Sequence, residues 1–476
     1  MKKTEKTVFS VFTRSEKYDN MVEKTGDRPK TESSNMKLSI STLGCRVNQY
    51  ESDAIAEMAE AEGFEVVPFG TPCDIAVINT CSVTAESDKK SRKLIRRAAA
   101  LSNGHVIVTG CSVGSSAEKI KIIPGVRAVI GNGAKDLVIS SAKGILSGSL
   151  AADGADLSAA PMTDMTDLET TRAHRARAFI KIEDGCNGKC AYCIIPSVRG
   201  PVRSRSAESI LNEVEKVSAT CPEIILTGIE TAAFGTDRKE KDALAKLMRD
   251  VDRIPTVKRL TLGSLDPTAL TDGFLENASS LESLLPHFHI SVQSGCSSVL
   301  ARMRRKYRAD AVLERMEATR KAIPGVSFSA DVIVGFPGET EEEFLETVAF
   351  CKKARFMHLH IFPYSRRRGT AADTMDGQLP EHVKDERLAR LAGIQADIKR
   401  QFMEELCKKY RDGGCLVLAE QKKSGCYIGH SPEFAEVKIK CDRDVVGTVC
   451  DVALESTDGE VCFGRPACKV KPSKKT

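Results

Sequence analysis

The sequence predicts an α/β protein with two βα series in succession and a small all-β module near its end. Over most of the 476 residues, continuous apolar strands alternate with helix-length segments, a pattern typical of parallel strands covered by helices. The segment Gly144–Ala160 is rich in Gly, Ser and Ala and divides this pattern in two, so we place a linker over residues 146–171. After about residue 405 short strands follow one another between turn residues, which indicates a small β barrel.

The composition is typical of a soluble globular protein, with 41% hydrophobic and 28% charged residues in a chain long enough for roughly two to four domains. No apolar run approaches the roughly 20 residues that a membrane-spanning helix needs. The first residues are basic but lack the long apolar region of a signal peptide, so we expect a cytoplasmic protein without a membrane partner. The net charge of +5 permits nucleic-acid binding without indicating it.

The N-terminal part of the chain comprises a polar extension and a first domain. Residues 1–36 are polar and without periodicity, which predicts a disordered extension. Residues 37–145 alternate strands with helices, which predicts a doubly wound parallel sheet. The expected strands are Lys37–Thr42, Asp74–Asn79 and His105–Gly110, and the expected helices are Asn48–Glu62 and Ala85–Leu101.

The second βα series occupies residues 172–405 and has six strands separated by helix-length segments, which predicts a partial βα barrel. These strands are Ala178–Glu183, Glu223–Gly228, Arg259–Ser264, His287–Gln293, Ala330–Gly335 and His358–Tyr364. A polar helix over Glu381–Tyr410 then leads into the all-β module, residues 406–470. Residues 471–476 form a basic tail.

The chain contains 17 cysteines and no export signal, so clustered cysteines are more often metal ligands or catalytic groups than disulfides. Most of them are expected to be neither. Eight stand singly among strand-like or helical residues and are predicted to be small buried hydrophobes: Cys73, Cys221, Cys351, Cys407, Cys426, Cys441, Cys450 and Cys462.

Three cysteines lie close together in the spacing C-x3-C-x2-C, at Cys186, Cys190 and Cys193. Three such thiolates can bind three irons of a [4Fe–4S] cluster and leave the fourth iron open for chemistry. A structural zinc site is the alternative, but it needs a fourth Cys or His, and none follows at the expected spacing. The loop also follows the first strand of the predicted barrel, where active sites of βα barrels lie.

A second triad is dispersed along the first domain. Cys45, Cys81 and Cys111 each come directly after one of its three expected strands. The carboxyl ends of parallel strands line one crevice, so the three thiols can converge there and hold a second cluster with an open iron. The alternative is that all three are buried cysteines without a ligand role.

The cluster loop, with Tyr192 directly before its last cysteine, resembles the radical S-adenosylmethionine (SAM) superfamily. The resemblance implies that SAM binds the open iron and is split by one electron into a 5′-deoxyadenosyl radical. Segments at three further strand ends resemble those that contact the methionine, the ribose and the adenine of SAM: residues 227–230, 291–295 and 331–339. The implied cofactor-binding residues are Tyr192, Gly228, Glu230, Gln293, Ser294, Asp331, Gly335 and Pro363. No catalytic residue beyond the cluster ligands is assigned.

Longer segments resemble the methylthiotransferase family. They are LGCRVNQYES (43–52), NTCSVT (79–84), CNGKCAYCIIP (186–196), VQSG (292–295) and GFPGE (335–339). The residues around the first two cysteines resemble the bacterial branch that acts on N6-threonylcarbamoyladenosine beside the tRNA anticodon, and the all-β module is similar to the family's RNA-binding TRAM domain. Two residues depart from the pattern of this branch: Glu230 stands where His or Asn is expected, and Cys296 where Ser is usual.

The resemblance implies two [4Fe–4S] clusters, one on Cys186, Cys190 and Cys193 that generates the radical, and one on Cys45, Cys81 and Cys111 that carries sulfur. SAM would be both radical source and methyl donor, and the product a 2-methylthio adenosine. The implied partners are a tRNA anticodon stem-loop, an electron donor such as flavodoxin or ferredoxin, and a sulfur donor. Basic residues could contact RNA phosphates or form ordinary solvated faces; the candidates are Arg199, Arg203, Arg205, the helix carrying Arg92–Arg97, and Lys or Arg on the β module.

Two alternatives stay open. The same chemistry could act on another substrate, either isopentenyladenosine in tRNA or a ribosomal-protein aspartate. The chain could also be a non-catalytic iron–sulfur protein that binds RNA. The complete set of SAM-like strand ends disfavours the second alternative, because a scaffold has no need of them.

Overall fold

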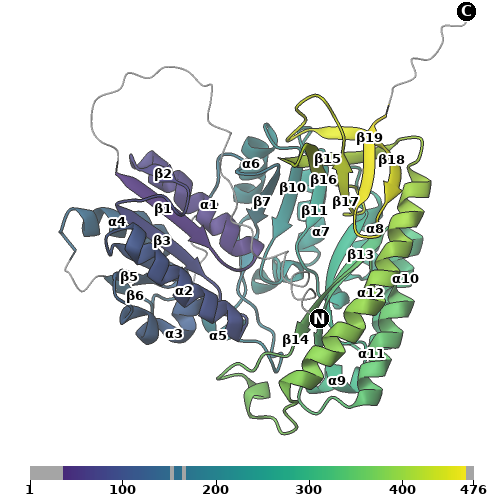
Figure 1. Ribbon diagram of the computed structural model, residues 1–476, viewed down its shortest axis with the longest axis horizontal. Helices are drawn as coiled ribbons and strands as arrows, with labels where there is room; N and C mark the ends of the chain where they lie inside the picture. The colour runs from purple at the N-terminus through teal and green to yellow at the C-terminus, as the bar shows by residue number, and fades with distance from the viewer. Residues whose placement is uncertain (1–35, 151–154, 163–167, 468–476) are drawn as a thin grey trace, which may run out of the picture. The chain divides into compact units, whose positions relative to one another are not determined.

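The computed structural model describes residues 36–150, 155–162 and 168–467, which form two compact units. The N-terminal unit contains the described residues up to Thr171, together with Asp184–Gly188 and Cys193–Arg203. The C-terminal unit contains Arg172–Glu183, Lys189–Tyr192 and the chain from Ser204 onward. Figure 1 colours most of the first unit purple to blue and the second teal to yellow. The predicted basic tail and nearly all of the predicted N-terminal extension lie outside the described residues.

The N-terminal unit is built on a parallel sheet of six strands in the order β2-β1-β3-β4-β5-β6, which confirms the predicted doubly wound sheet. The strands are β1 Lys37–Thr42, β2 Glu65–Val67, β3 Ile75–Thr80, β4 Val106–Gly110, β5 Val126–Ile130 and β6 Ala155–Leu157. The edge strand β6 lies in the segment interpreted as a linker, because its backbone pairs with β5 despite the absence of an apolar period.

Helices cover both faces of this sheet (Figure 1). They are α1 Arg46–Ala61, α2 Ala85–Leu101, α3 Cys111–Lys121, the 3-10 turn η1 Asn132–Leu137, α4 Val138–Leu146 and the short α5 Ile195–Arg199. Alternate residues of β3 enter two separate cores, with Ile75 and Val77 on one face and Ala76 and Ile78 on the other. All of β3 is therefore buried, which explains its continuous apolar sequence.

The C-terminal unit contains the predicted partial βα barrel, with six parallel strands. They are β7 Arg177–Lys181, β10 Glu223–Thr227, β11 Arg259–Leu262, β12 His287–Gln293, β13 Ser327–Val334 and β14 His358–Pro363. Backbone hydrogen bonds join these strands into two sheets, β11-β10-β7 and β12-β13-β14, and single parallel bridges at Leu260–Leu284 and Leu265–Ile290 connect the two. Each predicted strand is present to within a few residues.

Helices and short turns connect the barrel strands on their outer side. The helices are α6 Ala207–Ser218, α7 Ala243–Asp252, α8 Asp272–Ser279, α9 Ser297–Arg302, α10 Ala309–Ala322, α11 Glu341–Ala354 and α12 Glu381–Lys409. The 3-10 turns are η2 Thr231–Ala233, η3 Thr236–Arg238, η4 Pro267–Ala269 and η5 Ala371–Thr374, and two short strands, β8 Glu183–Asp184 and β9 Arg203–Ser204, flank the cluster loop. Apolar residues of these helices and of the strands share one core.

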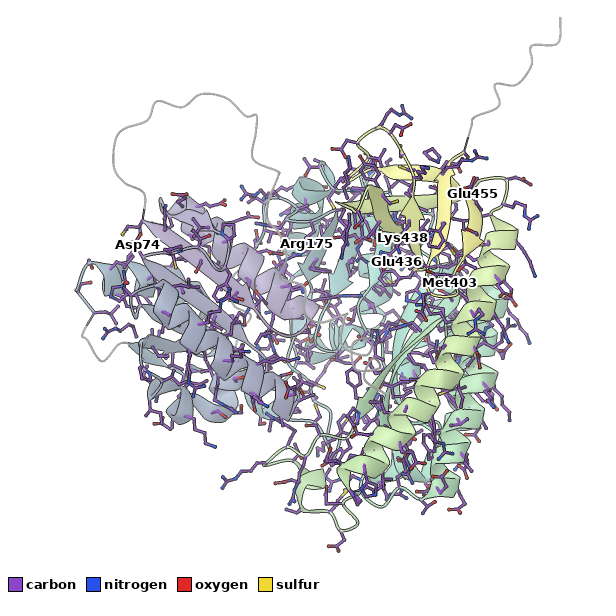
Figure 2. All side chains as sticks on the ribbon, viewed as in Figure 1. Asp74, Arg175, Met403, Glu436, Lys438 and Glu455 are labelled. Atoms are coloured by element: carbon purple, nitrogen blue, oxygen red, sulfur yellow. The ribbon has the colours of Figure 1, made fainter. Side chains whose placement is uncertain are left out.

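The all-β module is a closed five-stranded barrel in the order β15-β16-β17-β19-β18, as predicted. Its strands are β15 Cys415–Lys423, β16 Cys426–His430, β17 Glu436–Ile439, β18 Val449–Thr457 and β19 Cys462–Pro466. Its core, which includes Tyr427 and Cys462, extends onto α12 through Met403, labelled in Figure 2. This small barrel therefore shares its apolar core with the last helix of the βα barrel.

Polar contacts attach the small barrel to the amino ends of the βα-barrel strands. Arg259, the first residue of β11, is 3% exposed and pairs with Glu223 Oε2 at 2.6 Å. Its Nη1 donates to the carbonyl oxygen of Leu416 at 2.6 Å, and its Nη2 to that of His430 at 3.3 Å. Ser327, the first residue of β13, donates to the carbonyl oxygen of Glu433 at 2.7 Å. These contacts leave the opposite, carboxyl ends of the strands to the candidate site.

Five of the eight single cysteines are buried as predicted: Cys73, Cys221, Cys351, Cys407 and Cys462. The prediction was wrong for Cys426, Cys441 and Cys450, which are half-exposed. Cys426 and Cys450 lie on strands of the small barrel, where alternate side chains face outward, and Cys441 lies in the connection after β17. Within the described residues, no helix is long and apolar enough to span a bilayer.

We predict that Arg259→Met lowers the free energy of unfolding of the C-terminal unit by about 3 kcal/mol, because it leaves the buried Glu223 carboxylate without its cation. Thermal unfolding measures the loss, and limited proteolysis would detect release of the small barrel. Arg253→Met is the control, since its exposed pair with Asp250 is expected to contribute less than about 1 kcal/mol. Equal effects of both substitutions would contradict the docking role of Arg259.

Candidate functional site

The N-terminal unit brings the residues of the dispersed cysteine triad to one edge of its sheet. Cys45 follows β1, Cys81 follows β3 directly, and Cys111 is the first residue of α3 after β4. These three strands are neighbours in the sheet, so their carboxyl ends lie side by side. All three cysteines are free thiols.

Two glycines allow the close approach of the loops that carry these cysteines. A Cβ on Gly44 would lie 3.3 Å from the sulfur of Cys81, so the residue before Cys45 abuts the second cysteine. Gly110, directly before Cys111, has φ +94°, and a Cβ there would lie 2.4 Å from the carbonyl oxygen of Thr80. A side chain at Gly110 would therefore push the Cys111 loop away from the Cys81 loop.

The thiols of the triad influence one another. Burial raises the pKa of Cys81 to about 12, and the charges of Cys111 and Cys45 act in the same direction. Cys45 is exposed as a whole residue, yet the loss of solvent around its sulfur raises its pKa, and the Arg199 guanidinium opposes this rise. A metal must therefore displace protons from these thiols, as it does in other thiolate sites.

The surroundings of the triad fit a multi-iron cluster. Three thiols converge without forming a disulfide, and Ser82 Oγ, fully buried beside Cys81, has no hydrogen-bond partner among the described residues. A hydroxyl in this position can donate to a cluster sulfur, which is one way in which proteins adjust such groups. Thiolate donors are those that iron–sulfur clusters require.

Arg199, a candidate for RNA contact from the sequence, is instead fully buried in the N-terminal unit, and that prediction was wrong. Its Nε donates to Cys111 Sγ at 3.3 Å, and its Nη1 to both carboxylate oxygens of Asp184 at 2.9 and 3.0 Å. Nη1 and Nη2 also donate to Glu51, and Nη2 donates to Asn48 Oδ1 at 2.5 Å. Burial alone would lower the pKa of Arg199, but the charges of Asp184, Cys111 and Glu51 raise it well above its usual value.

Arg203 and Arg205 are also unavailable to RNA, because each is 7% exposed. Arg203 donates to the carbonyl oxygens of Arg199 and Pro201 and lies 3.7 Å from Asp184. Arg205, in the C-terminal unit, pairs with Glu213 at 2.6 Å. The carboxylates beside them, Asp184 and Glu213, lie outside the basic run itself, so the sequence presented these arginines only as a cluster of positive charges. The basic residues of α2 include exposed side chains, and their contact with RNA stays a prediction.

The cluster loop lies between β8 and α5, and its three cysteines are half-buried free thiols. In the N-terminal unit, backbone N–H groups of Gly188 and Ile195 donate to the sulfurs of Cys186 and Cys193, at 3.2 and 3.4 Å. Hydrogen bonds of this kind favour the thiolate form, which an iron–sulfur cluster needs. The donor set therefore fits the predicted cluster.

Arg305 in the C-terminal unit donates to the sulfur of Cys190 at 3.3 Å. It also pairs with Asp266 at 2.7 Å and donates to the carbonyl oxygen of Ser291 at 2.9 Å. Burial would lower its pKa, but Tyr192, Tyr307 and Asp266 raise it. The sequence analysis missed Arg305, because nothing in its local sequence points to a cysteine 115 residues away.

Most of the predicted SAM-binding residues lie at the carboxyl ends of the barrel strands. Gly228 follows β10, where a Cβ would lie 2.1 Å from Glu183 Oε1, so a side chain there would displace the buried Glu183 carboxylate. Burial and the charge of Asp266 raise the pKa of Glu230 to about 7. Gln293 ends β12 with φ +69° at a register shift, a local irregularity of the kind found beside active sites.

Three of the remaining predicted SAM contacts lie at the ends of β12, β13 and β14, and the fourth is Tyr192. Ser294 is buried and its Oγ lies 3.1 Å from Thr347 Oγ1. Gly335 has φ +71°, and its N–H donates to Glu339 Oε2 at 2.6 Å. Pro363 is the last residue of β14. Tyr192 lies in the C-terminal unit, to which Lys189–Tyr192 belong. Contact of these residues with SAM stays a prediction.

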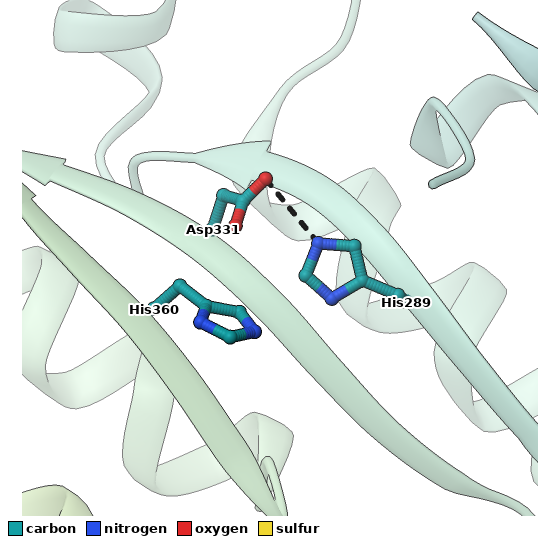
Figure 3. A group of neighbouring side chains, drawn as sticks. All are labelled: His289, Asp331 and His360. Carbon is teal, nitrogen blue, oxygen red and sulfur yellow. Dashed lines mark ion pairs between the residues drawn. The ribbon is translucent and has the colours of Figure 1, made fainter. Parts of the chain in front are cut away.

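Asp331 differs from the other candidates, because it lies within β13 rather than at its end. Figure 3 shows its carboxylate beside the imidazole of His289 on β12, with His360 of β14 next to them. His289 Nε2 lies 3.2 Å from Asp331 Oδ2, and the three ligand atoms are within 4.8 Å of one another, close enough for a single metal ion. The His-x-His pairs of β12 and β14 were a sequence signal for this group that the sequence analysis did not use.

Comparison with known proteins finds a family match for each of the two regions that carry a cysteine triad. The radical SAM superfamily matches residues 180–351, and a family described as uncharacterized protein family UPF0004 matches residues 37–131. The chain is 37% identical to the threonylcarbamoyladenosine tRNA methylthiotransferase MtaB of Bacillus subtilis, over 87% of this chain and 92% of that protein. It is 35% identical to the tRNA-2-methylthio-N6-dimethylallyladenosine synthase of Streptomyces viridosporus, over 75% of this chain and 72% of that protein.

Among solved structures, the radical SAM methyltransferase TsrM of Kitasatospora setae matches with a TM-score of 0.55. The match covers 71% of this chain and 77% of that one at 15% identity. At this identity the likeness concerns the fold alone.

We predict that Gly110→Ala destabilises the metal-free protein by about 2 kcal/mol or more, because it adds a steric clash to an unfavourable backbone angle. Gly63→Ala is the comparison, since Gly63 also has a positive φ, +87°, but nothing within 4 Å of its Cβ position. Only the backbone penalty of about 1 kcal/mol is expected there. Thermal unfolding compares the two, and a Gly110→Ala protein as stable as Gly63→Ala would show that the loops do not approach as described.

Proposed function

We propose that this chain, which belongs to the radical SAM methylthiotransferase family, converts N6-threonylcarbamoyladenosine beside the tRNA anticodon into its 2-methylthio derivative. The observation that carries this proposal is the convergence of Cys45, Cys81 and Cys111 at one sheet edge, in a chain that also has the radical SAM cysteine loop. A second thiolate triad is expected in an enzyme that holds the sulfur to be inserted on a second cluster.

The choice of nucleoside rests on how much of each relative the chain covers. Proteins named threonylcarbamoyladenosine tRNA methylthiotransferase MtaB match over 92% of their length in Bacillus subtilis and 95% in Thermotoga maritima. The dimethylallyladenosine synthases of two Streptomyces species match over 72% of theirs, although that of Thermosipho melanesiensis matches over 98% at a lower identity of 30%. Identity and coverage together favour the threonylcarbamoyl substrate.

The C2–H of adenine is neither acidic nor electrophilic, so acid–base groups alone cannot replace it. A cluster on Cys186, Cys190 and Cys193 with bound SAM would supply the carbon radical, and a cluster on Cys45, Cys81 and Cys111 would supply the sulfur. The protein's own part is to hold these groups, orient SAM at the strand ends and exclude water. Arg305 fixes Cys190 and Asp266 in the C-terminal unit, and the glycines at 228 and 335 keep the strand ends free of side chains.

The closed β15–β19 barrel is expected to bind the RNA, as a TRAM-like module. Exposed cations on it include Lys422 and Lys423 of β15 and Arg465 of β19. Contacts to phosphates carry most of such affinity and make it dependent on salt. An electron donor such as flavodoxin or ferredoxin and a separate sulfur donor complete the reaction, because it consumes both electrons and sulfur.

The nucleoside test uses tRNA from cells that lack the enzyme. We expect that the reconstituted protein, given SAM, a reductant and sulfide, converts N6-threonylcarbamoyladenosine into a product heavier by one SCH2 unit, as detected by mass spectrometry of digested tRNA. tRNA that carries isopentenyladenosine serves as the competing substrate in the same reaction. Methylthiolation of isopentenyladenosine alone would overturn the assignment of the nucleoside while leaving the enzyme class intact.

The number of clusters is tested separately by iron and sulfide analysis. We expect about eight irons per chain after anaerobic reconstitution, and about four in either triple variant, Cys45/Cys81/Cys111→Ala or Cys186/Cys190/Cys193→Ala. Cys73→Ala is the control, because that buried thiol lies outside both triads and should leave the iron content unchanged. About four irons in the unmodified protein and none in the Cys186/Cys190/Cys193→Ala variant would leave a single cluster and remove the sulfur-carrying role of Cys45, Cys81 and Cys111.

A further inference from the structure

Arg199 places a buried positive charge directly on the second cysteine triad. The guanidinium is completely buried, and its Nε donates to Cys111 Sγ at 3.3 Å. A buried arginine usually satisfies its donors with oxygen acceptors. One donor of Arg199 is instead directed at a sulfur that is expected to bind iron.

The rest of the guanidinium is fixed by its partners, so this direction is determined by the fold. Asp184 accepts two hydrogen bonds from Nη1, and Glu51 accepts from both terminal nitrogens. Asn48 accepts from Nη2 and donates to the carbonyl oxygens of Leu43 and Thr80, the residues that lie close to Cys45 and Cys81 in the chain. A planar guanidinium held on two sides has little freedom to turn Nε away from Cys111.

Two further cations belong to this ion-paired group. Lys135 pairs with Glu51 and is itself fully buried, and Arg203 lies near Asp184. Arg199 is the cation of this group that donates directly to a thiol of the triad, where its charge can balance negative charge on a cysteinate ligand.

We propose that Arg199 is a positioning residue that raises the reduction potential of the cluster on Cys45, Cys81 and Cys111. This inference rests on the proposed function, since it requires a cluster at that triad. A hydrogen bond and a positive charge at a ligand sulfur both stabilise the more negative, reduced form of a cluster. Asp184, which holds Arg199, lies two residues before Cys186, so one guanidinium connects the second triad to the loop of the first within the N-terminal unit.

The test measures a midpoint potential rather than turnover. The full chain with Cys186/Cys190/Cys193→Ala serves as the parent, because only the cluster on the other triad can then form. Arg199→Gln and Arg199→Lys are made in this parent, and each protein is reconstituted, analysed for iron and sulfide, and titrated with reductant while the electron paramagnetic resonance signal of the reduced cluster is followed. Arg203→Gln is the matched control, since it removes a buried cation beside Asp184 that, among the described residues, donates to no cysteine.

We expect iron to be retained and the potential to become more negative in Arg199→Gln, with a smaller shift in Arg199→Lys, which keeps the charge but loses the Nε donor. The potential of Arg203→Gln should stay closer to that of the parent than either. An unchanged potential in Arg199→Gln with iron retained would overturn the proposal. Loss of iron from both Arg199 variants with an unchanged circular dichroism spectrum would also overturn it, because Arg199 would then build the site rather than tune it.

The result is separable from that of the proposed function. A parent protein that binds no iron would show that the second triad holds no cluster, which is a failure of the proposed function. A parent that binds about four irons, with variants that do not differ from it in potential, is a failure of the inference about Arg199 alone. The measurement requires no tRNA, so it does not depend on which nucleoside is the substrate.

Discussion

The buried guanidinium of Arg199 is the interaction on which the arrangement of the N-terminal unit depends. Removing a cation from water is costly, and the cost is offset only where every donor finds a well-placed acceptor. Arg199 meets this condition with Asp184, Glu51, Asn48 and Cys111, which come from β8, α1 and the start of α3. One side chain thereby fixes the positions of three segments that the sequence separates widely. The same contacts that offset its burial also hold a cysteine of the candidate site.

The C-terminal unit uses a similar device. Arg305 donates to Cys190 at the same distance, 3.3 Å, as Arg199 does to Cys111. Each triad therefore has one cysteine whose sulfur accepts from a largely buried arginine, which in turn is paired with an aspartate. Thiolate clusters are negatively charged and mostly desolvated, so a fixed cation at a ligand sulfur lowers the cost of holding them. A lysine could supply the charge but not the several directed donors.

The amino and carboxyl ends of the βα-barrel strands have different roles. At the amino ends, Arg259 and Ser327 bind the backbone of the small barrel, and the apolar core continues through Met403 into α12. At the carboxyl ends, glycines and irregular backbone leave room beside the strands. This division follows from the parallel arrangement, because all strands end on the same side and the loops there can converge on one ligand.

The sequence by itself predicted the architecture, which the structure confirms, and the candidate thiol ligands. Apolar strands at regular spacing predict parallel sheets, and C-x3-C-x2-C predicts a cluster loop, because both depend on residues close together in the chain. Only the tertiary structure decided the roles of the arginines. Arg199 looked like an RNA contact in a basic run, yet its acceptor Glu51 is 148 residues away, and His289, Asp331 and His360 meet only across three strands. Periodicity depends on residues that are neighbours in the sequence, so it can be recognised there. The partner of a buried charge depends on which distant segments the fold brings together.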